Sequence, residues 1–150
     1  MFHVKYSPNE EFAVSDGAIV SLHDCVATSL RIEGDDLLID FPKGIWVQAI
    51  KTGAAVARLK NFEFGSVWLF RKARLPLLWH ACVGTKRLLD EDDLIQKVNS
   101  GTWTLEFLYE FRCSDQRLFQ CVVQPASLIR SNKPTLELCI DTPRIEYSWN

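Results

Sequence analysis

The segment Thr102–Arg112 has the sequence TWTLEFLYEFR, in which apolar and polar residues alternate. Its even-numbered residues are polar except for Leu108. Successive side chains of a strand point to opposite faces of a sheet, so this alternation predicts a half-buried antiparallel strand. At about 3.4 Å per residue the strand would extend roughly 35 Å and cross the whole domain. The odd-numbered residues, which would share one face, are all apolar or aromatic: Trp103, Leu105, Phe107, Tyr109 and Phe111.

Further strands are predicted on both sides of this segment, and one short helix directly before it, around residues 91–99. In the helix, the acidic run Asp90–Asp93 precedes an apolar face, and Gly101 stands where a helix-terminating glycine belongs. The strands recur every eight to twelve residues or so, which predicts a mainly β fold: an antiparallel meander that forms a sandwich or barrel-like core. Besides the central segment, the predicted strands are Phe2–Tyr6, Val26–Ile32, Leu37–Phe41, Ile45–Ile50, Ala54–Phe64, Val67–Phe70, Leu77–Val83, Leu118–Gln124, Thr135–Asp141 and Arg144–Trp149.

The segment Ala54–Phe64 differs from the other strands because neither of its faces is purely apolar. This pattern predicts an edge strand or a strand exposed on both faces. An unpaired edge is a natural template for another strand, so a homodimer formed through this segment is a further expectation.

The composition is that of an ordinary globular protein. A chain of 150 residues, 47% hydrophobic and 24% charged, is the usual size of one domain, and we expect residues 1–150 to form one. A net charge of −2 gives no global reason to expect nucleic acid or an anionic membrane as the partner. No apolar run approaches the roughly 18 residues of a membrane span, and the N-terminus lacks a secretory signal pattern, so a cytoplasmic protein is expected. The five scattered cysteines are an odd number, which favours free thiols over a disulfide framework.

Three consecutive residues, His23, Asp24 and Cys25, are all of catalytic or ligand type. A thiolate beside an imidazolium can act as a nucleophile. Neighbours in an extended chain point in opposite directions, however, so these three side chains cannot converge without a turn. The simpler interpretation is the start of a strand, with Asp24 bonded to nearby backbone amides and Cys25 packed. No catalytic residue is therefore assigned.

A metal site is a second hypothesis. His80 and Cys82 are two residues apart, and so are His23 and Cys25, so each pair can lie on one face of a strand. Together the four side chains would supply the ligands of a zinc site if their strands were neighbours. Packed thiols and hydrogen-bonded histidines are more frequent than such sites, so no cofactor is predicted.

Charged and aromatic residues offer weaker signals. Arg71–Arg74 and the nearby Lys86-Arg87, flanked by Trp68 and Trp79, are a candidate patch for single-stranded nucleic acid. The acidic total argues against nucleic acid, and a solvated loop is the simpler interpretation. The acidic runs Asp35-Asp36 and Asp90–Asp93 are explained locally, as a hairpin turn and a helix N-terminus.

The tryptophans favour recognition over chemistry. No nucleophile elbow, phosphate loop, dinucleotide fingerprint or zinc-protease motif occurs in the chain, which lowers the expectation of an enzyme. Trp46, Trp68 and Trp79 lie near predicted strand ends or turns. Exposed aromatic residues are enriched in protein–protein hot spots and ligand clefts, so these three are the candidate binding residues.

Several segments resemble small bacterial β-proteins, some of which are grouped with the immunity proteins of contact-dependent or polymorphic toxin systems. The similar segments, which cover only part of the chain, are Leu22–Cys25, Leu30–Leu37, Phe41–Gly44, Trp103–Phe111 and Tyr147–Asn150. They are hairpin-like rather than catalytic, and no functional residues carry over. The resemblance implies a non-enzymatic protein that binds another protein.

The sequence therefore predicts a cytoplasmic binding protein without catalysis, which recognises another protein in the manner of an immunity protein. Two alternatives remain open at this point. One is a small-molecule binder with an aromatic cavity inside a β-barrel. The other is a metal-dependent or thiol enzyme that uses His23, Cys25, His80 and Cys82.

Overall fold

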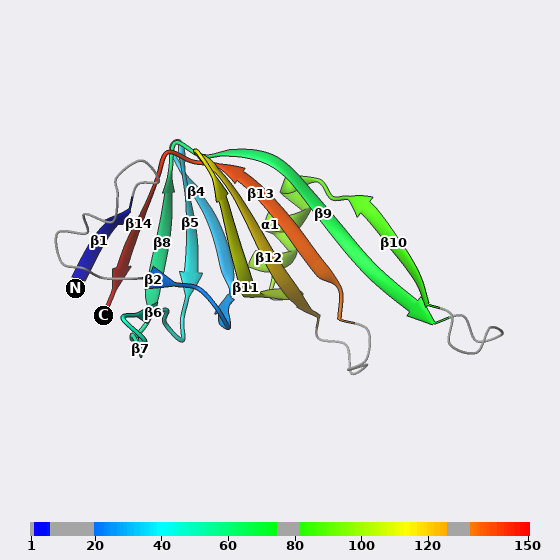
Figure 1. The fold of residues 1–150 in the computed structure, drawn as a ribbon, viewed down its shortest axis with the longest axis horizontal. Helices are drawn as coiled ribbons and strands as arrows, with labels where there is room; N and C mark the ends of the chain where they lie inside the picture. Colours follow the sequence, from blue (N-terminus) through cyan, green and yellow to red (C-terminus); the bar gives the residue numbers. More distant parts are fainter. Residues whose placement is uncertain (1, 7–19, 75–81, 126–132) are drawn as a thin grey trace.

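The computed structural model describes residues 2–6, 20–74, 82–125 and 133–150, and within them a mainly β fold with one short helix, as predicted (Figure 1). All strand pairs are antiparallel. The strands form a five-stranded, a six-stranded and a small three-stranded sheet. The two large sheets are open and pack into a sandwich-like core. An aromatic edge-to-face contact joins them, with the ring centroids of Phe41 and Phe107 5.4 Å apart, and Phe107 makes a second such contact with Phe119 of its own sheet at 5.4 Å.

In the two large sheets, the order of the strands differs from their order in the chain. In the five-stranded sheet the order is β1 (Phe2–Tyr6), β14 (Arg144–Trp149), β8 (Ala55–Lys60), β5 (Asp36–Phe41) and β4 (Ser29–Glu33). In the six-stranded sheet it is β10 (Cys82–Leu88), β9 (Glu63–Arg74), β13 (Thr135–Asp141), β12 (Gln116–Pro125), β11 (Trp103–Cys113) and β3 (Cys25–Ala27). The small sheet contains β2 (Val20–Ser21), β6 (Trp46–Val47) and β7 (Ile50–Lys51).

The chain passes between the two large sheets at short connections. Only Thr28 separates β3 from β4. The turns between β4 and β5, β8 and β9, β11 and β12, and β13 and β14 meet at one end of the molecule, from which the strands fan out (Figure 1). Backbone bonds tie these turns together: Phe62 donates to the carbonyl of Asp35, and Thr142 donates to that of Asp115. The hydroxyl of Thr142 lies 2.7 Å from the carbonyl oxygen of Lys60. Strand-switching connections of this kind let two curved sheets share one core.

Three predictions about strands need correction. The predicted strand Ile45–Ile50 is divided into β6 and β7 because Gln48 and Ala49, both with positive φ, form a turn inside it. The basic run Arg71–Arg74 is not a loop but the end of β9, a strand of 12 residues. The predicted strand Leu77–Val83 lies mostly outside the described residues, which contain β10 from Cys82 onward.

The prediction of an edge strand at Ala54–Phe64 is also wrong. The segment contains β8, which pairs with β14 on one side and with β5 on the other. Its alternate residues Ala55, Ala57 and Leu59 are buried, and its charged residues point to the opposite face. A central strand tolerates those cations because carboxylates neutralise them there. The edges of the large sheets in the described residues are β1, β4, β3 and β10.

That neutralisation centres on Asp36, whose side chain is only 9% exposed. Its Oδ2 atom accepts hydrogen bonds from Arg58 Nη1 at 2.9 Å and from Lys60 Nζ at 2.7 Å. Its Oδ1 atom accepts one from the backbone amide of Asn61 at 3.1 Å. These donors, Lys60 foremost, lower the pKa of Asp36 from 3.8 to about 2. The carboxylate thus joins the β4–β5 hairpin to the end of β8.

We expect Asp36→Asn to lower the free energy of unfolding by about 1–2 kcal/mol at neutral pH. Because the folded pKa lies below the unfolded one, the stabilisation is complete above pH 3.8 and disappears as the pH falls towards 2. Wild type should therefore lose more stability than the variant over that interval. Urea unfolding at a series of pH values measures this. The exposed neighbour Asp35 supplies the control, and an Asp35→Asn variant with the same pH profile as Asp36→Asn would contradict the assignment.

The helix α1 (Glu91–Asn99) covers the core beside β4 and β11. It buries Leu94 and Val98, and its first turn is acidic, as predicted. The side chain of Asn99 continues the free edge of β4, since its Oδ1 accepts from the amide of Leu30 and its Nδ2 donates to the carbonyl of Leu30, both at 2.8 Å. The helix thereby closes the gap between the two sheets at this point. No helix in the described part of the chain is long and apolar enough to cross a membrane.

Candidate functional site beside the bulge of β11

A β-bulge at Leu108 divides the central strand β11 into two halves. The pairing of β11 with β12 shifts register between Phe107, opposite Cys121, and Tyr109, opposite Gln120. One extra residue in a strand reverses the facing of every residue after it. Trp103, Leu105 and Phe107 are buried, but Tyr109 is 57% exposed and Phe111 is 53% exposed. The prediction that all five odd-numbered side chains share one face is therefore wrong beyond the bulge.

The bulge creates a surface that we name the aromatic ledge: His23, Tyr109 and Phe111. The ring centroids of Tyr109 and Phe111 are 6.5 Å apart, and that of His23 lies 5.8 Å from Tyr109. The ledge sits at a free strand edge. β3 pairs with β11 only from Leu105 to Phe107, and no described strand pairs with the remainder of β11 on that side. Exposed aromatic rings are thus held on a rigid element beside unpaired backbone groups.

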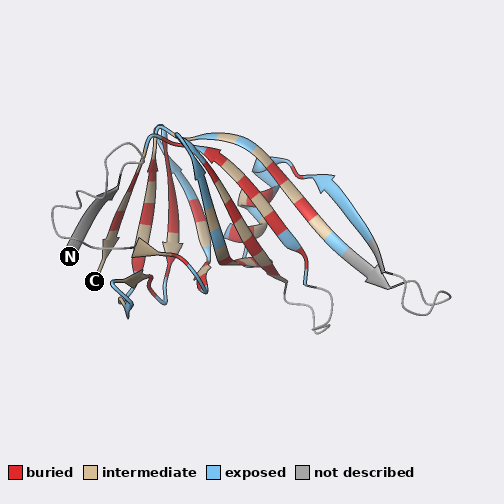
Figure 2. Ribbon diagram, viewed as in Figure 1, coloured by how far each residue is buried: buried red, intermediate tan, exposed pale blue. Residues whose placement is uncertain are grey.

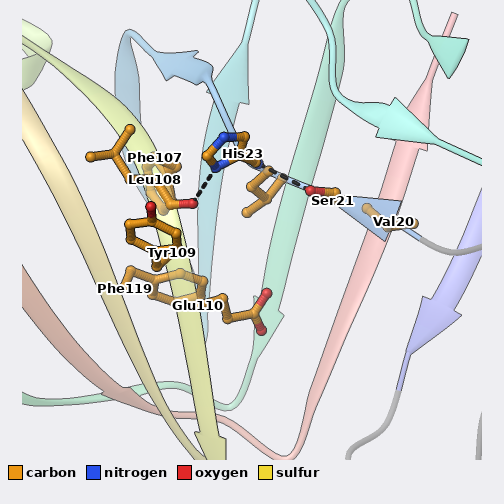
Figure 3. A pocket seen from close by; sticks show the side chains of 9 residues that line it. Val20, Ser21, His23, Phe107, Leu108, Tyr109, Glu110 and Phe119 are labelled. Carbon is orange, nitrogen blue, oxygen red and sulfur yellow. Dashed lines mark hydrogen bonds between the residues drawn. The ribbon is translucent and has the colours of Figure 1, made fainter. Parts of the chain in front are cut away.

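A pocket of about 290 Å³ opens next to the ledge (Figure 3). The segment from Val20 to His23 forms one wall, and the bulge of β11 forms the other. In Figure 3 the imidazole of His23 points towards the bulge, where its Nδ1 atom lies 2.6 Å from the carbonyl oxygen of Leu108. The pocket is just smaller than typical small-molecule sites, which occupy roughly 300–1,000 Å³. Its lining is Val20, Ser21, Leu22, His23, Phe107, Leu108, Tyr109, Glu110 and Phe119.

Beyond the bulge, charged side chains take the inward positions that Tyr109 and Phe111 would otherwise occupy. Glu110 lies opposite Phe119, and its Oε1 atom is 2.5 Å from Nη1 of Arg117, which is fully buried. Oε1 also accepts from Nε of Arg112 at 3.2 Å. Burial raises the pKa of Glu110 despite the opposing attraction of Arg117. The pKa of the buried Tyr147 phenol is raised too, first by burial and then by the charge of Glu110.

The structure brings the side chains of His23 and Asp24 together and separates Cys25 from them. Asp24 has a φ of +58°, so the chain turns there. The side chains of His23 and Asp24 are about half exposed, with 3.3 Å between Nε2 and Oδ2. Cys25 is fully buried, and its thiol lies 3.2 Å from Nζ of Lys51 and beside the backbone carbonyls of Ser21 and His23. The thiol contacts these groups rather than the imidazole, so no nucleophile–base pair forms there.

Strand pairing does not bring together the two cysteines among the four candidate metal ligands. Cys25 belongs to β3 and Cys82 to β10, which are opposite edges of the six-stranded sheet with four strands between them. Adjacent strands are about 4.8 Å apart, so the neighbouring strands that a shared site requires are not present. His80 lies outside the described residues, as does the side chain of Cys82. Among the side chains that the structure describes, no group of three or more metal-ligating residues occurs.

Two of the three candidate binding tryptophans, Trp46 and Trp68, lie in different sheets. Trp46 is half-buried in β6 and packs against the core, with Nζ of Lys51 lying 5.0 Å from its ring centre. Trp68 is half-buried in β9 of another sheet, with Nζ of Lys86 at 4.4 Å. Trp79 lies outside the described residues. Sequence reasoning missed Tyr109 and Phe111 as exposed residues. The signal was Leu108, whose apolar side chain interrupts the polar half of the alternation.

Comparison of the chain with protein-family models, curated proteins and solved structures finds no match in any of the three. The geometry of the aromatic ledge and of the pocket is therefore the evidence that bears on function.

Proposed function

We propose that the protein binds another protein through the aromatic ledge and acts without catalysis, in the manner of an immunity protein. The supporting observation is the outward turn of Tyr109 and Phe111 at the bulge. An alternating strand would have buried both rings, and leaving them in water forgoes burial worth about 1.5–3 kcal/mol for each side chain. Aromatic residues on a rigid strand are typical anchors of protein interfaces.

The pocket supports a protein partner because it adjoins the ledge and is of side-chain size. Its lining combines apolar groups from Leu22 and Phe119 with polar groups from His23 and Glu110. One side chain of a partner can enter such a pocket while neighbouring residues cover the ledge. Interfaces commonly have this form, with a central anchor surrounded by contacts that exclude water.

The test is site-specific photo-crosslinking in cells that express the protein. A photoreactive phenylalanine derivative replaces Tyr109, and in a control it replaces Ile50, which is 71% exposed on the small sheet. We expect one discrete adduct from position 109 and none from position 50. The adduct partner is then purified and its complex with the wild-type protein is reconstituted at defined stoichiometry.

In the reconstituted complex, Tyr109→Ser and Phe111→Ser should each weaken binding by tenfold or more, because hot-spot aromatics contribute at least about 1.4–2 kcal/mol. Ile50→Ser should leave the affinity unchanged. Equal adducts from positions 109 and 50, or full affinity of both ledge variants, would refute the proposal. All three side chains are at least half exposed, so their replacement should not prevent folding.

A further inference from the structure

The strands β9 and β10 form a ribbon at the edge of the six-stranded sheet that is remote from the aromatic ledge (Figure 1). The two strands pair over the whole length of β10, from Cys82 opposite Arg74 to Leu88 opposite Trp68. Residues 84–88 are all exposed, and β10 is drawn in the exposed colour over this length in Figure 2. On its outer side, no described strand pairs with β10. The ribbon therefore presents a free strand edge to solvent.

The ribbon is strongly cationic. Residues 64–89 contain five lysines and arginines and no aspartate or glutamate: Arg71, Lys72, Arg74, Lys86 and Arg87. This segment carries +5 within a chain of net charge −2, so the remainder carries −7. Such an asymmetry produces a local positive potential that the total charge conceals.

The described arginines of the ribbon differ in their partners from those of the five-stranded sheet. Arg31, Arg58 and Arg144 each form an ion pair with a carboxylate of their own sheet. Arg71 and Arg87 form no ion pair with any described residue, and both are exposed. Lys86 lies over two aromatic rings, with Nζ 4.4 Å from the centre of Trp68 and 5.0 Å from that of Phe70. The ribbon thus combines two arginines without carboxylate partners and a positioned lysine.

We infer that the outer edge of β10 binds an acidic, extended segment of a partner protein by strand addition. The unpaired backbone groups of β10 would continue the sheet, while carboxylates on one face of the added strand pair with Arg71 and Arg87, which lie on the same face of the ribbon. The same cations would stand opposite one another if two copies paired through β10, so the edge is protected against self-association. This surface is separate from the aromatic ledge, and the inference does not rest on the proposed function.

A nucleic acid is less consistent with the same observations. Binding of single strands uses aromatic faces as stacking platforms, and Lys86 already covers the rings of Trp68 and Phe70. The negative charge of the remaining chain would repel a long polyanion, whereas a short acidic segment meets only the ribbon. A free strand edge also supplies backbone donors and acceptors in the spacing of another strand, which a phosphate backbone does not match.

The test uses fluorescence anisotropy with labelled peptides of seven residues, the length of β10. In the probe, glutamate alternates with valine. A second peptide carries lysine in place of glutamate, and a third is the acidic peptide with N-methylated backbone amides, which cannot add to a strand edge. A labelled single-stranded RNA is measured in parallel. The protein variants are Arg87→Glu and, as a control with the same change in charge, Lys43→Glu, which is exposed in a turn next to the five-stranded sheet.

We expect the acidic peptide to bind wild type and Lys43→Glu equally, and Arg87→Glu at least tenfold more weakly. The lysine peptide and the N-methylated peptide should not bind. Undiminished binding of the N-methylated peptide would overturn strand addition, and tighter binding of the RNA with the same dependence on Arg87 would assign the ribbon to nucleic acid. Absence of binding by every probe would also overturn the inference. The ledge variant Tyr109→Ser should bind the acidic peptide like wild type. Failure of one proposal can therefore be distinguished from failure of the other.

Discussion

Replacement of Glu110 by alanine should lower the free energy of unfolding by about 3–5 kcal/mol, the largest effect that we expect from removing one charged side chain. Glu110 is the carboxylate that lies 2.5 Å from the fully buried Arg117. Without it, the guanidinium of Arg117 stays in the core and loses this ion pair. Removing one partner of a buried pair costs far more than replacing both, since an uncompensated charge cannot regain its hydration. Equilibrium urea unfolding measures the change.

Two companion variants define the origin of that loss. In Glu106→Ala a glutamate of the same strand is removed from the other face, where it accepts a hydrogen bond from Gln124 at 2.7 Å. This control should cost about 1 kcal/mol, the usual value of one hydrogen bond. The double variant Glu110→Leu/Arg117→Leu should recover much of the stability that Glu110→Ala loses, because neither charge remains buried. If the double variant is no more stable than Glu110→Ala, the loss does not arise from a buried charge.

Replacement of Gly44 by alanine should destabilise the protein by about 3 kcal/mol or more, whereas Gly34→Ala should cost only about 1–2 kcal/mol. Both glycines have positive φ, +82° for Gly44 and +60° for Gly34, so both variants bear a similar backbone strain. They differ in available space. A methyl group at position 44 would overlap the backbone carbonyl groups of Thr52 and Gly53, which cannot swing aside as a side chain does. At position 34 nothing lies within 4 Å.

Thermal or urea unfolding of the two glycine variants isolates the steric part of this effect. The turn containing Gly44 sits between β5 and β6, and the amide of Gly44 donates to the carbonyl of Phe41 at 2.9 Å. A clash there should displace the segment from Ile45 to Thr52, which pairs with itself across the small sheet. Equal losses of stability for Gly34→Ala and Gly44→Ala would show that backbone strain alone accounts for both losses. The expected difference of more than 1 kcal/mol lies well above the error of such measurements.

Local sequence patterns predict where the strands and the helix of this fold lie. They do not predict which face of each strand is buried or the order of the strands in the sheets. Alternation finds β11, β12 and β13, and the acidic run before Leu94 together with Gly101 finds α1, because these signals depend on neighbouring residues. The order of the strands depends on contacts between distant segments. Hence β8, with Arg58 and Lys60 on one face, resembles an edge strand until Asp36 is seen to neutralise both.

The candidate site was harder to predict for a related reason. All odd-numbered residues from Trp103 to Phe111 are apolar or aromatic, which predicts that they share one buried face. The single extra residue at the bulge turns the odd-numbered residues after it to the exposed face. Beyond the bulge, Glu110 lies beside the buried Arg117 of the next strand, a contact between segments that no local pattern contains. His23 was singled out from its residue type, but its position beside Leu108 depends on the turn at Asp24. Local pattern therefore identified one member of the aromatic ledge and misplaced the other two.

The pairing of β1 with β14 also sets an order of events during synthesis. Phe2 lies opposite Trp149 and Tyr6 opposite Ile145, so β1 gains this partner only after the chain between residues 6 and 144 has been synthesised. Until then β1 has no described neighbour in the sheet, and β8 lacks its pairing on the same side. With chain growth at roughly 5–20 residues per second, the interval is on the order of ten seconds or more. Throughout it β1 is an unpaired strand, and an unpaired strand is a template for pairing with another chain.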